Sequence, residues 1–339
     1  MSFERSGGGG ISALASGEMA AITPVVPSAL NLAMGTRQVT VPLAFLPGPS
    51  LAPPLHLAYR PDQGNGPFGL GWALPVPYLC RQPLRQDRPA DGETQELFFL
   101  AGTTALIPIE RTPTRSHYRL PPPAVATELV YYRDPANDWW ELRDPAGQIS
   151  RYGAPGVAPP NPAVITDPGE RSRVVVWLLT SSQDPQGNEL HYEYARRPVI
   201  EHAGTEERPY LRRIQAMTPP GRAQKPGRIT VVFDYERRPD PFADTAAGVE
   251  LATRYRCTRI TVQTTALAER VIRRYGLHYR DSAPATPSLP ARSDLALLAQ
   301  LTAMNHSGEA ARTLAPLVFD YTRGEPSPQP QVALNIYVR

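Results

Sequence analysis

The chain has 339 residues, a formal net charge of +3, 25 Gly and 40 Pro. An interior Pro costs a helix about 3 kcal/mol, so this Pro content excludes an ordinary helical protein. A hydrophobic fraction of 41% excludes a disordered polar chain. Because single cores stop growing at about 250–300 residues, we expect one long β-rich body or two β subdomains, with Pro-rich loops.

The first predicted segment, residues 1–35, is a flexible arm rich in Gly and Ala without a sustained period. From Val39 the pattern changes: Val39–Leu43 and Leu55–Tyr59 alternate with period two, as half-buried strands do. Phe98–Leu100 and Ala105–Ile109 are predicted to form a hairpin. Pro-rich breaks follow, which mark loops rather than domain boundaries.

A weak internal repeat indicates two further hairpins. Asp144-Pro145-Ala146-Gly147 recurs as Asp184-Pro185-Gln186-Gly187. Asp, Pro and Gly at these places favour a type I turn, so Gly147 and Gly187 are assigned to hairpin turns. A Trp-containing run precedes each turn, and a strand with Tyr follows each turn.

A second repeat is a strand that ends in aromatic residues and Arg. It occurs as His191–Arg196, Val232–Arg237, Leu277–Arg280 and Val318–Arg323. Because Tyr buries its ring while its hydroxyl stays polar, such strands suit a thin curved sheet better than a dense globule. Helix is scarce: Ser293–Met304 fits a helix or a strand, and its context favours the strand. The tail Val332–Arg339 is predicted to be a strand with an open edge.

One glycine-rich word reads Gly64-Asn65-Gly66-Pro67-Phe68-Gly69-Leu70-Gly71-Trp72. This word resembles the hallmark of the N-terminal domain of the Salmonella virulence plasmid B protein (SpvB) family. The same domain opens the B subunits of insecticidal toxin complexes (Tc toxins). Further words agree in family order from about Gly8 to Tyr321, including Trp140-Glu141-Leu142, Val232-Phe233-Asp234-Tyr235 and Pro316-Leu317-Val318-Phe319-Asp320-Tyr321.

The resemblance implies an all-β fold with very little helix: a sheet of Rhs/YD-type β-hairpins forming part of a curved shell, or cocoon. We expect the arm at 1–35, an SpvB-like shell domain at 36–325, and a C-terminal strand or linker at 326–339 leading towards a missing propeller. The chain is expected to stop before that propeller and to lack the ADP-ribosyltransferase half that some SpvB proteins carry. The implied partner is an Rhs-repeat toxin C subunit or another toxin-complex subunit.

The expected function is structural. The chain is predicted to be a shell segment that helps encapsulate or carry a toxic polypeptide, which stays unfolded beside an apolar, aromatic face. The residues assigned to this architecture are Gly64, Asn65, Gly66, Pro67, Phe68, Gly69, Gly71, Trp72, Gly147 and Gly187. The alternative is a secreted carbohydrate- or cell-surface-binding β module, with Trp139, Trp140 and Trp177 as stacking platforms.

No catalytic residue, cofactor or metal site is predicted, and we expect no enzyme. Gly64 to Gly69 fit G-x-G-x-x-G by letters, but Pro67 prevents the helix that a dinucleotide site requires. The six His never occur at metal-ligand spacing. Cys80 and Cys257 form at most one bridge, and two buried thiols are the favoured interpretation.

The remaining expectations concern partners and location. Arg residues are spread along the chain rather than clustered, so no nucleic-acid partner is expected. No apolar run is long enough to insert into a membrane. The N-terminus is a poor signal peptide, so a protein made in the bacterial cytoplasm would be secreted by another route.

Overall fold

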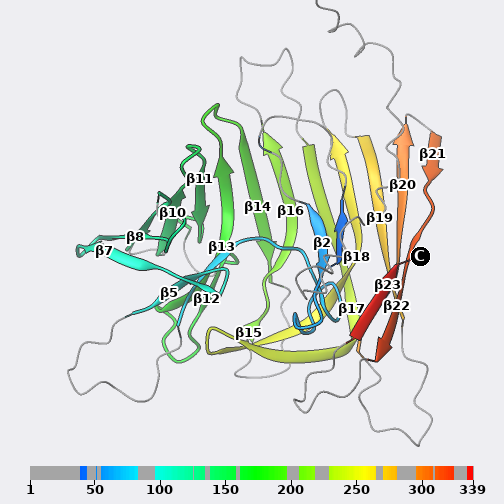
Figure 1. Cartoon of the computed structure of the whole chain (residues 1–339), viewed down its shortest axis with the longest axis horizontal. Coiled ribbons are helices and arrows are strands. Elements are labelled where there is room, and N and C mark those ends of the chain that lie inside the picture. The colour runs from blue at the N-terminus through cyan, green and yellow to red at the C-terminus, as the bar shows by residue number, and fades with distance from the viewer. Residues whose placement is uncertain are drawn as a thin grey trace, which may run out of the picture.

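The structure is a computed structural model of the whole chain (Figure 1). It describes residues 39–43, 51, 55–82, 96–124, 126–133, 138–157, 161–196, 206–217, 229–264, 270–280, 295–307, 310–323 and 334–338. The predicted arm at 1–35 and Ser293, the first residue of the segment that fits a helix or a strand, lie outside these residues.

The N-terminal described strands form a small three-stranded antiparallel sheet. Its strands are β1 (Val39–Pro42), β2 (His56–Tyr59) and β3 (Trp72–Ala73). Val39 pairs with Tyr59, and Tyr59 pairs with Trp72 on its other side. The apolar residues of the alternating pattern are the buried ones, as expected for a sheet with one covered face.

The next strands close on themselves into a ring. They are β4 (Tyr78–Arg81), β5 (Phe98–Leu100), β6 (Thr104–Ala105), β7 (Ile107–Arg111), β8 (Arg115–Arg119), β9 (Glu128–Tyr132), β10 (Trp139–Arg143), β11 (Ile149–Tyr152), β12 (Val164–Thr166) and β13 (Val174–Gln183). The ring closes because β13 pairs with β11 on one side and with β4 on the other, where Val176 lies opposite Cys80. Aromatic side chains fill the ring: Trp140 and Trp177 are fully buried, and the Phe98 ring lies 4.9 Å from that of Trp140.

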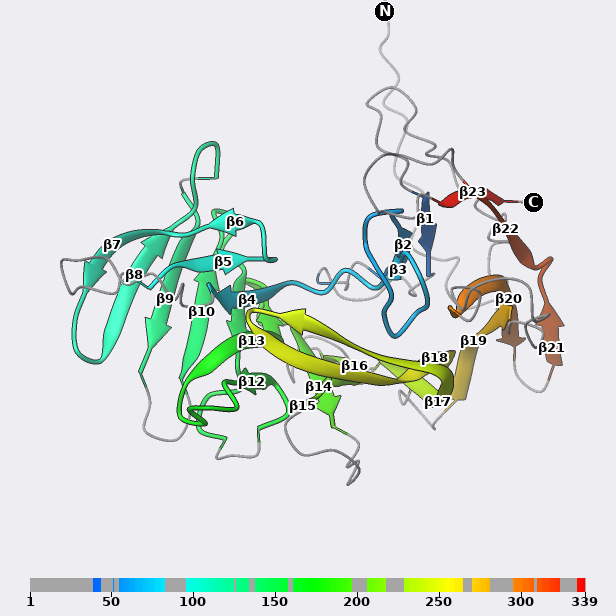
Figure 2. The same cartoon turned by 90° about the horizontal axis from the view of Figure 1, so that it is seen from below.

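From β13 the pairing continues strand by strand as a curved antiparallel sheet, here called the open sheet because no pairing among the described residues joins its last strand back to its first. Its strands are β14 (Glu189–Ala195), β16 (Tyr210–Met217), β17 (Ile229–Ala246), β18 (Val249–Thr264), β19 (Arg270–Arg280), β20 (Leu297–Ser307), β21 (Ala310–Thr313), β22 (Leu317–Arg323) and β23 (Leu334–Val338). A short strand, β15 (Glu206–Glu207), runs parallel to β18. Figure 2 shows this sheet curving around β1–β3.

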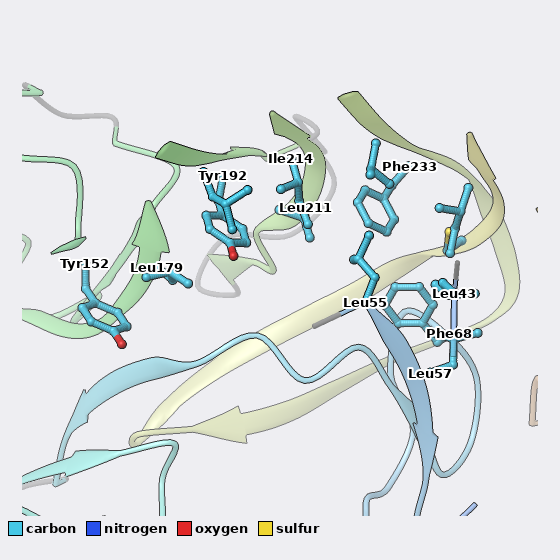
Figure 3. Packing of buried hydrophobic residues seen from close by; sticks show 14 of the residues in the cluster. Leu43, Leu55, Leu57, Phe68, Tyr152, Leu179, Tyr192, Leu211, Ile214 and Phe233 are labelled. Carbon is cyan, nitrogen blue, oxygen red and sulfur yellow. The ribbon is translucent and has the colours of Figure 1, made fainter. Parts of the chain in front are cut away.

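The apolar face of the open sheet is covered by the N-terminal segment of the same chain. In Figure 3, Leu55 and Phe68 lie next to Phe233, on the face that also carries Leu211 and Ile214. These residues belong to one continuous buried cluster that extends into the ring. The ring and the open sheet therefore share a single hydrophobic core.

The long hairpin of β17 and β18 also ties the open sheet to the ring. Its tip forms a second buried cluster, in which Val249 and Leu251 pack with Ile165, Val175 and Val176 of β12 and β13. The hairpin can extend this far because a register irregularity between Arg237 and Phe242 bends β17 without ending its pairing.

The predicted fold class is confirmed: within the described residues the structure is all-β, without helix, and its large antiparallel sheet is curved. The ambiguous segment before Met304 is a strand, β20. No helix among the described residues is long and apolar enough to cross a membrane.

Candidate functional site

The glycine-rich word forms a compact loop that docks on the open sheet. The Gly71 N–H donates to the Gly64 carbonyl at 2.7 Å, which closes the loop. Gly69 has φ +94°, and a Cβ there would lie 2.7 Å from the carbonyl oxygen of Ala296. Only glycine allows both this backbone conformation and this close approach.

Main-chain hydrogen bonds attach the loop to two strands far along the chain. The Leu70 N–H donates to the Ala296 carbonyl at 2.9 Å, and the Cys257 N–H donates to the Pro67 carbonyl at 2.7 Å. The loop thus supplies hydrogen-bond partners for the Ala296 carbonyl, just before β20, and for the Cys257 N–H within β18. Backbone groups in such buried places need a partner.

A buried ion pair holds the same loop. The Arg238 side chain is fully buried and that of Asp240 is 7% exposed, with Nε 2.8 Å from Oδ1. Arg238 also donates to the Asn65 side-chain oxygen at 2.8 Å and to the Gly66 carbonyl at 3.1 Å. Asp240 accepts from the Ala296 N–H at 2.7 Å and from the Asn65 amide at 3.3 Å.

Burial by itself would raise the pKa of the Asp240 carboxyl. The hydrogen bonds from Arg238, Ala296 and Asn65 outweigh burial, so the pKa lies below its usual value. Neither Arg238 nor Asp240 was among the residues predicted from the sequence. No local signal identifies this pair, because its burial depends on a loop 172 residues away.

Trp72 anchors the end of the loop. Its side chain is 1% exposed, and its ring lies 4.8 Å from Phe319 and 5.4 Å from Tyr59. Its indole N–H donates to the Tyr321 hydroxyl at 2.8 Å. The loop, the ion pair and Trp72 together fasten the first described strands to the last ones.

Tyrosine hydroxyls also link successive strand pairs of the open sheet. In four places the Tyr of the repeated aromatic word donates to a carbonyl of the preceding strand: Tyr194 to Leu179 (3.0 Å), Tyr235 to Leu211 (2.8 Å), Tyr279 to Cys257 (2.6 Å) and Tyr321 to Leu298 (2.6 Å). Burial raises the pKa of each of these hydroxyls, so each stays a neutral donor. We call this series the tyrosine ladder.

A cavity of about 290 Å³ lies beside the loop, between the chain that follows Trp72 and the strands β14, β16 and β17. Its wall includes the rings of Tyr194, Tyr210 and Tyr235. At its edge Arg208 donates to Asp244 at 2.5 Å. The hydroxyls of Tyr194 and Tyr235 are engaged within the chain, so they do not offer free polar groups to the cavity.

The two predicted hairpin turns lie outside the docked loop, one in the ring and one where the ring joins the open sheet. Gly147 and Gly187 both have positive φ, at 81° and 82°, and each N–H donates to the carbonyl of the Asp three residues earlier. They join β10 to β11 and β13 to β14. The structure therefore brings Gly64–Trp72 together at one site and places the other two glycines elsewhere.

Two of the three proposed carbohydrate platforms are wrong. Trp140 and Trp177 are fully buried in the ring, because strand alternation turns them inward. Trp139 is half-buried, and its ring stacks on the neighbouring Tyr132 at 4.1 Å.

The cysteines are free thiols: Cys80 lies in β4, and burial raises the pKa of Cys257. Within the described part of the chain no three His, Cys, Asp or Glu residues form a metal-binding group.

Solved toxin-complex structures share the fold. The crystal structure of TcdB2-TccC3 has a TM-score of 0.67 and 20% identity, over 85% of this chain and 16% of that chain. The Photorhabdus luminescens Tc holotoxin pore also gives a TM-score of 0.67, with 21% identity over 85% of this chain and 16% of that one. The N-terminal domain of effector protein SpvB from Salmonella typhimurium strain LT2 gives 0.61 with 22% identity, over 81% of this chain and 98% of that domain.

Curated relatives correct one expectation. The mono(ADP-ribosyl)transferase SpvB of Salmonella typhimurium is 27% identical over 187 residues, which make up 47% of this chain and 30% of the relative. The protein of the same name from Salmonella dublin matches to the same extent. The expectation of no enzyme is therefore wrong, since these relatives carry the name of a transferase.

The family itself follows from the sequence match. A family model described as the Salmonella virulence plasmid 65kDa B protein matches residues 31–213, just over half of the chain. The match includes the docked glycine-rich loop, Trp72 and the ring strands. The chain belongs to the family of the Salmonella virulence plasmid 65kDa B protein.

Proposed function

We propose that the chain is a wall segment of a toxin-delivery complex, and that it helps to encapsulate or carry a toxic polypeptide. The observation that carries this proposal is the curved open sheet built from repeated, tyrosine-linked strand pairs. Such a sheet extends by adding strand pairs, each contacting its neighbours, so it suits a wall that several chains build together. The likeness in fold to the TcdB2-TccC3 complex supports it.

The proposed wall does not hold its cargo against an apolar, aromatic face. The apolar, aromatic face is packed against β1–β3 and the glycine-rich loop and is not free for a cargo. Among the described residues the exposed large hydrophobic side chains are scattered: Leu97, Ile109, Val157 and Leu295. A wall whose described residues expose only scattered hydrophobic side chains would confine an unfolded chain without an extended apolar patch that binds it.

The partners proposed from this interpretation are other toxin-complex subunits, including an Rhs-repeat C subunit, in a secreted assembly. The chain covers 16% of the length of its structural neighbour in TcdB2-TccC3. The enclosure is therefore proposed as a property of the whole assembly, to which this chain contributes one part.

Co-expression with an Rhs-repeat toxin subunit tests the proposal. We expect one complex by size-exclusion chromatography with light scattering, and slower digestion of the subunit's toxic segment by protease in the complex than in the subunit alone. Separate elution of the two chains, or equal digestion rates, would contradict the proposed containment.

A further inference from the structure

The cavity beside the glycine-rich loop is large enough to hold a small molecule. Its volume is about 290 Å³. A dry apolar cavity of about 150 Å³ already holds benzene. Besides the tyrosines, its wall includes the aliphatic residues Leu74, Val76 and Leu178. One apolar group of the size of an aromatic ring therefore fits, together with a small polar head.

The tyrosines of the wall have their hydroxyls engaged within the chain. Those of Tyr194 and Tyr235 donate to carbonyls of the ladder. The Tyr210 hydroxyl accepts from the N–H groups of Arg254 and Tyr255, at 2.9 and 3.2 Å. A ligand group that enters this part gains by burying apolar surface, whereas a polar group would lose its hydration there.

Two opposite charges lie at the edge of the cavity. Arg208 donates from Nε to the Thr253 hydroxyl at 2.8 Å and from Nη2 to Oδ1 of Asp244 at 2.5 Å. Within the described part of the chain, Nη1 of Arg208 and Oδ2 of Asp244 have no partner. The two side chains are 24% and 41% exposed. The ion pair therefore presents a charged donor and a charged acceptor side by side.

This arrangement of charges selects a ligand that carries both signs. A ligand with a carboxylate alone is attracted by Arg208 and repelled by Asp244, and a ligand with an ammonium alone meets the reverse. A free α-amino acid carries both groups on one carbon. Its carboxylate can accept from Arg208 while its ammonium donates to Asp244, and both hydrogen bonds are then charge-assisted.

We propose that this cavity binds a free α-amino acid with a large apolar side chain, such as phenylalanine. The carboxylate accepts from Nη1 of Arg208, the ammonium donates to Oδ2 of Asp244, and the side chain lies in the apolar part of the cavity. A terminal residue of a polypeptide lacks one of the two charges and an internal residue lacks both, so the ligand is the free amino acid. This inference does not rest on the proposed function, because it uses only the cavity and its ion pair.

Isothermal titration calorimetry of the full chain with L-phenylalanine tests the proposal, together with analogues that each lack one feature. 3-Phenylpropionate lacks the ammonium, phenethylamine lacks the carboxylate, and L-alanine lacks the ring. N-Acetylphenylalanine and phenylalanine amide represent the last and the first residue of a polypeptide. We expect saturable binding of L-phenylalanine and binding of every analogue that is weaker by about tenfold or more, since a hydrogen bond to a charged group contributes at least about that factor.

The variant Asp244→Asn tests the location of the site. It keeps the shape of the side chain and removes its charge, so L-phenylalanine should bind about tenfold more weakly or worse. The same variant should bind 3-phenylpropionate more tightly than the wild type does, because Arg208 is no longer opposed; a loss of folding cannot produce this gain. The matched control is Asp234→Asn in the same strand, whose carboxylate lies 4.0 Å from Arg259 and outside the cavity wall. It should leave both affinities unchanged.

Three results would overturn the proposal. The first is the absence of saturable binding at millimolar L-phenylalanine. The second is an analogue that binds as tightly as L-phenylalanine; if it were the acetyl or amide derivative, the occupant would be a polypeptide terminus instead. The third is an Asp244→Asn chain that binds L-phenylalanine and 3-phenylpropionate as the wild type does.

Discussion

The tyrosine ladder makes a quantitative prediction about Tyr279→Phe. The Tyr279 hydroxyl donates to the Cys257 carbonyl at 2.6 Å, and the Arg256 guanidinium lies over its ring at 4.6 Å. The substitution deletes one oxygen and leaves the ring, so the packing on Arg256 and the main-chain register remain. What changes is the Cys257 carbonyl, which loses its side-chain donor in a buried setting.

The expected cost follows from that isolated change. A buried polar group left without a hydrogen-bond partner costs about 1–3 kcal/mol, whereas the mean net value of a hydrogen bond is about 1 kcal/mol. No cavity contribution is added, because the ring stays in place. We therefore expect the free energy of unfolding to fall by about 1–3 kcal/mol, which lowers the melting temperature by about 2–4 °C per kcal/mol in a chain of this size.

Urea unfolding followed by tryptophan fluorescence measures this change, with Tyr132→Phe as the matched control. Tyr132 is half-buried and stacks on Trp139. Deleting its hydroxyl should change stability by less than about 0.5 kcal/mol, as surface substitutions usually do. If both variants lose the same stability, or if Tyr279→Phe loses less than the control limit, the ladder hydroxyl does not stabilise the junction.

Further predictions concern the docked loop and the alkaline limit. Trp72→Ala should destabilise the fold by about 3–5 kcal/mol in thermal and chemical unfolding, and a change below about 1 kcal/mol would show that the indole is not buried. Asp240→Asn should cost about 3–5 kcal/mol, because it leaves the charge of Arg238 buried and uncompensated; stability equal to the wild type would contradict the buried pair. Burial raises the pKa of Tyr59 to about 12. The unfolded chain then loses this proton first, so the contribution of Tyr59 to stability is constant below about pH 10 and falls between about pH 10 and 12. Circular dichroism should record a loss of stability in that interval, and a Tyr59→Phe chain with the same loss would contradict this origin.

The sequence predicts the strands well because their signal is local. Alternation and turn residues at Gly147 and Gly187 are read within a few residues, and the glycine-rich word identifies the loop that docks. The repeated aromatic word also indicates which strands resemble one another. What the word does not reveal is the acceptor of each Tyr hydroxyl, because that carbonyl is set by the register of the neighbouring strand.

The errors and omissions share one cause, which is contact between distant parts of the chain. Trp140 and Trp177 look like surface platforms until β4 closes the ring against β13. Arg238 and Asp240 alternate along a strand like ordinary surface charges until the loop at Asn65 covers them. Local periodicity contains no information about either closure, so neither could be inferred from it.

The docking of Trp72 on Tyr321 also sets the order of events during synthesis. The two residues are 249 positions apart. At about 5–20 residues per second, a ribosome needs roughly 10–50 s to make that interval. The ring can fold while the chain is still growing, but Trp72 has no contact with Phe319 or Tyr321 until β22 has left the exit tunnel. The packing of Trp72 against Phe319 and Tyr321 therefore waits until all the intervening strands have been made.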